Sequence, residues 1–196
     1  MNLPNKLTIL RFFLTGLFLA VIFSGVRFHE SIALVLFAMA GITDHLDGRI
    51  ARSRNLITNF GKLMDPLADK IMTCSAFIAF VGLHLVPAWM VVVIVARELA
   101  ITGLRTLAAS KNLILAAERF GKHKTVSQIV AILAILVFLS FREWGSPGVA
   151  VFGTEVAGHP WIFWLAKFSM WVAVVLTIYS GCAYLWRNRE VYLSDM

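Results

Sequence analysis

The chain has 196 residues, of which 59% are hydrophobic and 15% are charged, and its mean hydropathy is +0.80. Soluble domains are about 45–50% apolar and about 25% charged, so this composition excludes a disordered chain, a coiled coil and a secreted disulfide scaffold. It indicates a polytopic membrane protein whose outer surface faces lipid, because a soluble fold of this size could not keep so much apolar surface from water.

Six apolar segments follow one another along the chain. They are continuous rather than alternating, which predicts helices and not the strands of a barrel. They cover roughly residues 7–26, 31–43, 71–85, 88–102, 125–141 and 161–186. The second segment is shorter than the ~20 residues that a spanning helix needs, so we expect it to continue as helix through Asp44 and Asp47 to Ala51. The sequence predicts an all-α polytopic membrane protein with six transmembrane helices, built as one domain over residues 1–196.

Most of the 18 Lys and Arg residues lie on one side of the predicted spans. They precede the first span, separate the second from the third and the fourth from the fifth, and follow the sixth. The positive-inside rule then places both termini and the charged loops in the cytoplasm, and we expect a multi-pass protein of the cell inner (cytoplasmic) membrane. The net charge of +7 therefore reflects topology, and nucleic acid is not expected as a partner.

Two features of the outer side and of the last span are expected to have structural roles alone. Residues 141–160 are rich in glycine and proline and predict a turn-rich connector without chemistry. Tyr184 and Trp186 lie where an aromatic belt at the membrane interface is expected, as lipid anchors or packing residues.

Four aspartates form the most informative pattern in the chain. Asp44 and Asp47 are three residues apart, and Asp65 and Asp69 are four apart, so each pair shares one face of a predicted helix. A short basic loop between the two helices allows them to run antiparallel and to bring the four carboxylates together. Such carboxylates would repel one another, and one or two divalent cations would remove that cost. Oxygen ligands without a His or Cys cluster favour Mg²⁺ or Mn²⁺ over zinc, so we expect a metal site at the cytoplasmic side.

A structural interpretation of these acids is that they pair with Arg49, Arg52 and Lys62 at the membrane interface. For one acid that interpretation is as good as a functional one. Four acids at these spacings, with two glycines between them, make it the weaker one, because acids at a membrane are costly and mark functional sites by default.

The spacing of these residues resembles the signature of the CDP-alcohol phosphatidyltransferases. Eight fixed positions match it without a departure, in the order Asp44-x2-Asp47-Gly48-x2-Ala51-Arg52-x8-Gly61-x3-Asp65-x3-Asp69. The resemblance extends to the six spans and so covers essentially the whole chain. It implies a phosphotransfer site with two metal ions, in which Asp44, Asp47 and Asp65 bind metal. Asp69 would be both a ligand of the second metal and the base that deprotonates the acceptor hydroxyl.

The same resemblance implies that three residues near the aspartates contact the CDP-diacylglycerol substrate. Gly48 lacks a side chain and would let the nucleotide approach the helix closely. Arg52 has a planar guanidinium that suits the diphosphate. Thr58 resembles a position of the family's loop that contacts the nucleotide.

The amino terminus offers two further contacts to this substrate. Asn5 and Thr8 lie in a segment that resembles the opening of bacterial members of the family, where Asn and Thr help to hold the cytidine group. On the residues alone, an interfacial helix is an equally good interpretation. Pro4 would then lie in its first turn, and Lys6 and Arg11 would face lipid head groups.

A second group of basic residues predicts a pocket for the phosphate of the acceptor. Its members are Arg97, Arg105, Lys122 and Lys124. The alternative for Arg97, which lies deep in an apolar run, is an internal ion pair with Glu98 or another acid. The order of Arg-Glu, Thr-Gly-Leu-Arg and Gly-Lys-x-Lys-Thr also resembles family members whose acceptor is sn-glycerol 3-phosphate.

The resemblance therefore implies transfer of a phosphatidyl group from CDP-diacylglycerol to sn-glycerol 3-phosphate in the bilayer. It also implies a homodimer, since family members are often dimers. Other acceptors of the same chemistry are inositol phosphate, inositol, serine and phosphatidylglycerol. A divalent-cation transporter is an alternative of another class, because intramembrane aspartates can line an ion path. The acids lie at one face rather than the midplane, which disfavours it.

Overall fold

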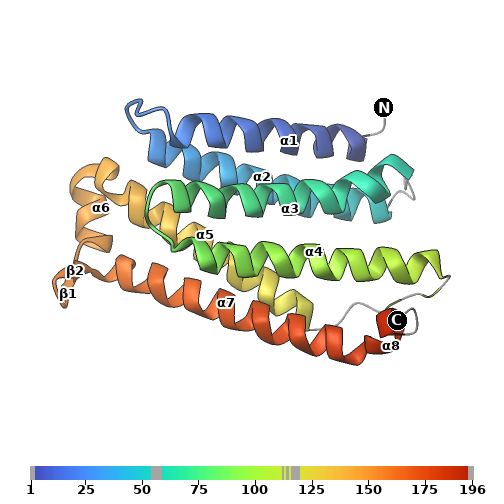
Figure 1. Ribbon diagram of the computed structural model, residues 1–196. Coiled ribbons are helices and arrows are strands. Elements are labelled where there is room, and N and C mark those ends of the chain that lie inside the picture. Colours follow the sequence, from blue (N-terminus) through green and yellow to red (C-terminus); the bar gives the residue numbers. More distant parts are fainter. Residues whose placement is uncertain (1–2, 54–58, 112, 114, 116–119, 194–196) are drawn as a thin grey trace.

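The computed structural model describes residues 3–53, 59–111, 113, 115 and 120–193. In this part of the chain, six long helices run back and forth side by side (Figure 1). These helices are α1 (Leu3–Ile22), α2 (His29–Ser53), α3 (Asn59–Gly82), α4 (Ala88–Ser110), α5 (Phe120–Ser140) and α7 (Trp161–Arg187). The prediction of a helical protein is confirmed. The expected extension of the second helix is confirmed too, since α2 runs through Asp44 and Asp47 to Ser53.

The alternating helix directions give the bundle two different ends (Figure 1). We call one the aspartate end: it holds the start of α1, the end of α2, the start of α3, the end of α7 and the short α8 (Arg189–Leu193). We call the other the connector end, because the segment between α5 and α7 lies there.

The helices differ in the length of their apolar stretches. In the described part of the chain, two helical segments are long and apolar enough to cross a membrane: residues His123–Phe152 and Trp161–Arg187. The first comprises most of α5 and the shorter helical turns that follow it. Shorter apolar helical stretches cover Thr8–Ile22, His29–Thr43 and Lys70–Gly82. Length and hydropathy thus support membrane association, while the count of six spans stays a prediction.

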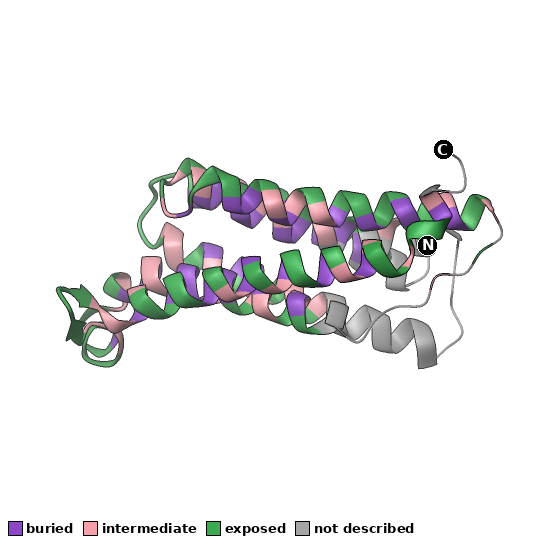
Figure 2. Ribbon diagram, turned by 60° about the horizontal axis from the view of Figure 1, so that its bottom comes forward, coloured by how far each residue is buried: buried purple, intermediate pink, exposed green. Residues whose placement is uncertain are grey.

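The core and the outer surface of the bundle are both apolar. Buried faces of the helices point toward one another and exposed faces point outward (Figure 2), with Phe77, Phe80 and Ile132 among the fully buried residues. On the outside, Phe13 is 66% exposed and Phe168 is 68% exposed. An apolar exterior of this kind indicates a surface that is covered by something other than water.

The segment between α5 and α7 contains more structure than a turn-rich connector. A 3₁₀ turn (η1, Phe141–Trp144) leads into α6 (Gly145–Phe152), and β1 (Glu155–Val156) pairs with β2 (His159–Pro160) in a small antiparallel hairpin. Glycine and proline here shape elements as well as turns. Pro147 falls in the first turn of α6, where a missing N–H costs nothing. A Cβ at Gly148 would come within 2.1 Å of the Phe141 carbonyl oxygen.

The connector also closes the start of α2. The Glu143 carboxylate accepts hydrogen bonds from the backbone N–H groups of Glu30 (3.3 Å) and Ser31 (2.8 Å), and the Trp144 indole donates to the Ser31 hydroxyl (2.9 Å). The first N–H groups of a helix have no partner within it. Glu143 therefore caps α2 from a distant part of the chain and fixes the connector to it.

Candidate metal and substrate site

The four motif aspartates lie on two helices that are adjacent in sequence. Asp44 and Asp47 belong to the second half of α2, and Asp65 and Asp69 to the first half of α3. The end of α2 and the start of α3 both lie at the aspartate end (Figure 1). The backbone thus brings both pairs to the same end of the bundle. The side chains of these four aspartates are not among those that the structure describes.

Several other predicted site residues also lie outside the described side chains. They are Asn5, Gly48, Arg52, Thr58 and Lys122. Among the side chains that are described, no group of three or more His, Cys, Asp or Glu residues could hold a metal ion. The metal ligands and most of the nucleotide contacts therefore stay predictions.

The start of α1 contributes two buried polar residues to this end. Thr8 and Arg11 are both 0% exposed, and α1 packs against α2 and α3, the two helices of the aspartate motif. Lys6 is exposed. The interfacial interpretation is therefore wrong for Arg11, which faces the inside of the bundle and not the lipid head groups. A single sequence offers no signal for this, because an arginine near a helix start suits both positions.

Three of the predicted acceptor residues are described, and two of them meet at one carboxylate. Glu98 forms ion pairs with Lys124 and, at 3.3 Å, with Arg97. All three side chains are nearly buried, at 7–12% exposure. The alternative interpretation of Arg97, as an ion-pair partner of Glu98, is thus confirmed. The Glu98 carboxylate contacts one cation from α4 and one from α5.

α7 completes the surroundings of Arg97. The Arg97 guanidinium donates to the Ser180 hydroxyl at 3.4 Å. A Cβ at Gly181 would come within 2.8 Å of the Arg97 Cγ, so the absence of a side chain at this position leaves room for the arginine stem. The sequence indicates Glu98 as a partner of Arg97, but it holds no indication of Ser180 and Gly181 as neighbours. The acid beside Arg97 in an apolar run was the one available signal.

The third described acceptor candidate lies farther along α4. Arg105 donates from Nε to the Tyr184 hydroxyl at 3.2 Å, and its guanidinium carbon lies 5.5 Å from the centre of that ring. Tyr184 is only 2% exposed. It is therefore a packing residue and a partner of Arg105, and it is not a lipid anchor. Trp186, which is 72% exposed, fits the expected aromatic belt.

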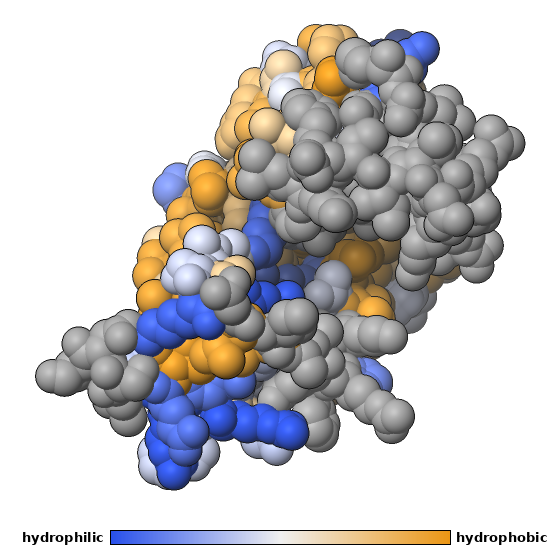
Figure 3. Space-filling view, turned by 90° about the vertical axis from the view of Figure 1, so that its right-hand side faces the viewer, coloured by the Kyte–Doolittle hydropathy of each residue, from blue (hydrophilic) through white to orange (hydrophobic). Residues whose placement is uncertain are grey.

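A polar contact links the aspartate helix to the helix of the basic residues. Lys70, directly after Asp69, donates from Nζ to the Thr102 hydroxyl, and that hydroxyl donates to the Glu98 carbonyl oxygen at 2.7 Å. The contact joins α3 to α4 one turn from the Glu98 ion pairs. Figure 3 looks onto this end and shows hydrophilic residues running from its middle to its lower edge beside apolar ones.

The arrangement suits the handling of phosphate groups at a membrane surface. Two helices bring four carboxylates to one end, which is a donor set for hard divalent cations. Neighbouring helices bring Arg105 and Lys124 toward the same end, and Arg97 lies near the middle of α4. Arginine and lysine are the usual partners of phosphate. These candidate phosphate-binding side chains thus lie between the middle of the bundle and its aspartate end.

Comparison with known proteins also indicates a protein that handles phosphate groups of lipids. Residues 1–179 match the CDP-alcohol phosphatidyltransferase family. A protein of Bacillus subtilis (strain 168) named CDP-diacylglycerol–glycerol-3-phosphate 3-phosphatidyltransferase is 39% identical to this chain over 96% of each. A protein of the same name from Rickettsia typhi is 33% identical over 93% of this chain and 94% of the relative. Another from Mycoplasma pneumoniae is 37% identical over 82% of this chain and 79% of the relative. The chain belongs to the CDP-alcohol phosphatidyltransferase family.

Proposed function

We propose that this protein transfers a phosphatidyl group from CDP-diacylglycerol to sn-glycerol 3-phosphate, releasing CMP and forming phosphatidylglycerol phosphate. The observation that carries the proposal is the name of relatives that are similar to this chain over nearly its full length. The acceptor hydroxyl oxygen attacks the phosphorus that adjoins diacylglycerol. The bond from that phosphorus to the CMP oxygen breaks, and CMP leaves with the electron pair.

Asp44, Asp47, Asp65 and Asp69 would hold Mg²⁺ or Mn²⁺, as two ions. Their fit rests on the donor set, since α2 and α3 present four aspartates and the motif holds no cluster of His or Cys residues. Bound cations supply charge neutralisation at the diphosphate of the donor substrate.

The remaining roles belong to side chains of this protein. Asp69 takes the proton of the acceptor hydroxyl as the oxygen attacks. The cytidine diphosphate lies against Asn5, Thr8, Gly48, Arg52 and Thr58.

The basic residues bind the acceptor before it reacts. The phosphate of the acceptor lies against Arg97, Arg105, Lys122 and Lys124. Charged contacts of this kind favour a phosphorylated acceptor over inositol or serine. Because Glu98 already holds Arg97 and Lys124 close together, the two cations are pre-positioned for one anion.

The protein is proposed to lie in the cell inner (cytoplasmic) membrane as a multi-pass protein, with six spans and with both termini and the aspartate end facing the cytoplasm. The exposed apolar helix faces support the bilayer as its surroundings, and the basic residues at the aspartate end support the orientation. A soluble, charged acceptor then reaches the site from the cytoplasm while the lipid tails stay in the membrane. We propose a homodimer as its assembly, on the resemblance to the family alone.

An acceptor panel tests the proposal. Purified protein is given CDP-diacylglycerol with Mg²⁺ or Mn²⁺ and, in separate reactions, glycerol 3-phosphate, inositol phosphate, inositol, serine or phosphatidylglycerol, and CMP release is measured. We expect CMP release with glycerol 3-phosphate and its loss on addition of a chelator. Incorporation of inositol phosphate instead would overturn the acceptor, and metal flux into proteoliposomes without CMP release would overturn the reaction class.

A further inference from the structure

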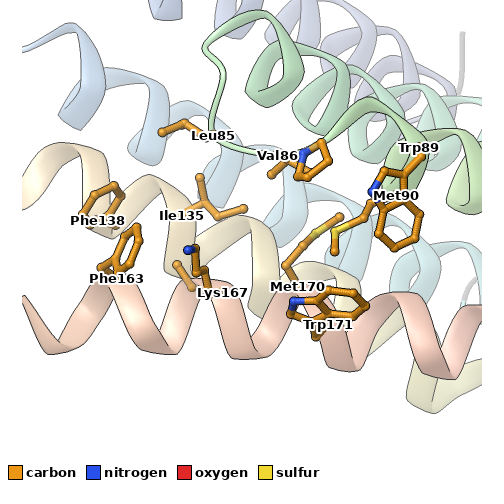
Figure 4. A pocket seen from close by; sticks show the side chains of 12 residues that line it. Leu85, Val86, Trp89, Met90, Ile135, Phe138, Phe163, Lys167, Met170 and Trp171 are labelled. Carbon is orange, nitrogen blue, oxygen red and sulfur yellow. The ribbon is translucent and has the colours of Figure 1, made fainter. Parts of the chain in front are cut away.

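An apolar pocket lies at the connector end, away from the end that holds the aspartates. It has a volume of about 300 Å³ and is bounded by the α3–α4 turn, the start of α4, the end of α5 and the first turns of α7 (Figure 4). Its walls are almost entirely apolar. They include Val86, Met90, Ile135, Phe138, Met170 and Trp171.

Lys167 is the one charged residue among the side chains that line this pocket. The Lys167 side chain rises from α7 between the rings of Phe138 and Phe163 on one side and Met170 on the other (Figure 4). Its ammonium nitrogen lies 4.6 Å from the centre of the Phe163 ring and 5.8 Å from that of Trp164. Among the residues that the structure describes, no carboxylate pairs with Lys167. Aromatic faces attract a cation but leave its full charge available to an anion.

The position of Lys167 fits the depth of a lipid head group. It follows Trp161, the first residue of α7, by six positions, or about 9 Å of helix. Its nitrogen lies over Phe163, one turn nearer to the start of α7. The side chain thus bends toward the outer end of the helix, as lysines do when they reach from hydrocarbon to the interface.

The mouth of the pocket opens on a face that the bilayer would cover. Trp89 and Trp171 line the pocket and are about half exposed, and their ring centres are 5.7 Å apart. Phe168, beside Lys167, is 68% exposed. Apolar surface of this extent on a membrane helix faces acyl chains.

We propose that this pocket binds an anionic phospholipid of the leaflet at the connector end, with one acyl chain among the apolar walls and the negative head group at Lys167. The apolar lining selects a chain over a polar ligand. The uncompensated cation selects a net negative head group, since a zwitterionic lipid has its own cation beside its phosphate. This site is separate from that of the nucleotide-linked lipid, because the aspartates lie at the other end of the bundle. It depends on the membrane placement proposed above, though not on the reaction.

Lipid binding to the purified, delipidated full chain tests the proposal. The chain is titrated in detergent with dioleoyl phosphatidylglycerol and, separately, with dioleoyl phosphatidylcholine, and bound lipid is counted by native mass spectrometry. We expect the anionic lipid to bind more tightly, on the order of fivefold for one lysine at low salt, with the difference shrinking as salt rises. Lys167→Gln should remove the difference.

Two further variants separate this site from general lipid binding. Arg142→Gln is the matched control, because Arg142 is an exposed cation at the same end that also lies over an aromatic ring but does not line the pocket. Ala166→Leu fills part of the pocket and should weaken the binding of both lipids. Thermal unfolding and CMP release check that each variant is folded. Equal affinity of the unchanged chain for the two lipids, or equal effects of K167Q and R142Q, would overturn the proposal.

Discussion

Four of the eleven acidic residues of the chain lie in the motif on α2 and α3. Acids are scarce here because the chain as a whole is apolar, so their concentration at one end of the bundle has a cost that only a function offsets. Asp69 is the last of them. It differs from the other three in its proposed role, because it moves a proton as well as binding metal.

Asp69→Asn should reduce turnover by about two to four orders of magnitude, the usual contribution of a positioned base. Asparagine keeps the size and one oxygen ligand, so we expect binding of CDP-diacylglycerol to remain. CMP release and equilibrium binding of the lipid nucleotide measure the two effects. Glu190→Gln changes an exposed acid outside the motif and is the control. Turnover near that of the unchanged chain would refute the assignment of Asp69 as the base.

Glu98→Ala should destabilise the protein, by about 3–5 kcal/mol, because it leaves two nearly buried cations without their shared carboxylate. Glu98→Gln keeps the shape of the side chain and removes its charge, so its stability should lie between that of the unchanged chain and that of Glu98→Ala. Unfolding in detergent measures the loss, with E190A as the exposed control. An effect of E98A no larger than that of E190A would show that the ion pairs contribute nothing.

At the scale of single residues, the sequence is enough to identify the motif and the family, and it is not enough to describe the surroundings of the motif. The motif is a matter of spacing, which the sequence states directly. The environment of Arg11 or Tyr184 depends on which helix packs against which, and both residues are amphipathic enough to suit either a buried or an interfacial position. The partnership of Glu98 with Lys124 joins residues far apart in the chain, and no local pattern indicates it.

At the scale of elements, the connector is the part that hydropathy describes least well. The long helices follow from continuous apolar runs, and the extension of α2 past Asp44 follows from the length that a span needs. α6 was missed because glycine and proline dominate its first turn, where they are tolerated. The contact of Glu143 with the start of α2 depends on tertiary structure and leaves no trace in local composition.

Glu143→Ala should lower the stability of the bundle by about 1–2 kcal/mol, the usual value of a helix cap. The carboxylate accepts two backbone N–H bonds at the start of α2, where the helix dipole also favours a negative charge. The expected signature is a lower unfolding midpoint and faster hydrogen exchange at Glu30 and Ser31. Glu155→Ala removes an exposed acid of the same connector and should change neither. Equal midpoints for E143A and E155A would show that the cap is unimportant.

At the scale of the whole molecule, the alternating helices sort the charges by end. The aspartate end carries described basic residues such as Lys6, Arg105 and Lys124, together with the motif. The connector end carries the apolar pocket around Lys167 and the capped start of α2. A membrane that admits basic segments more readily on its cytoplasmic side would therefore fix the direction of every helix at once, and with it the side from which a soluble acceptor enters.

Cysteine labelling in intact cells tests this orientation. Cys74 and Cys182 are first replaced by serine, and single cysteines are introduced by Thr154→Cys in the connector or by Ser110→Cys at the end of α4. Both positions are exposed and lie at opposite ends of the bundle (Figure 1). We expect T154C to react with a membrane-impermeant maleimide in intact cells and S110C to react only after the cells are opened. The reverse pattern would place the aspartate end outside the cell, away from the cytoplasmic pool of phosphorylated acceptor, and would overturn the proposed orientation.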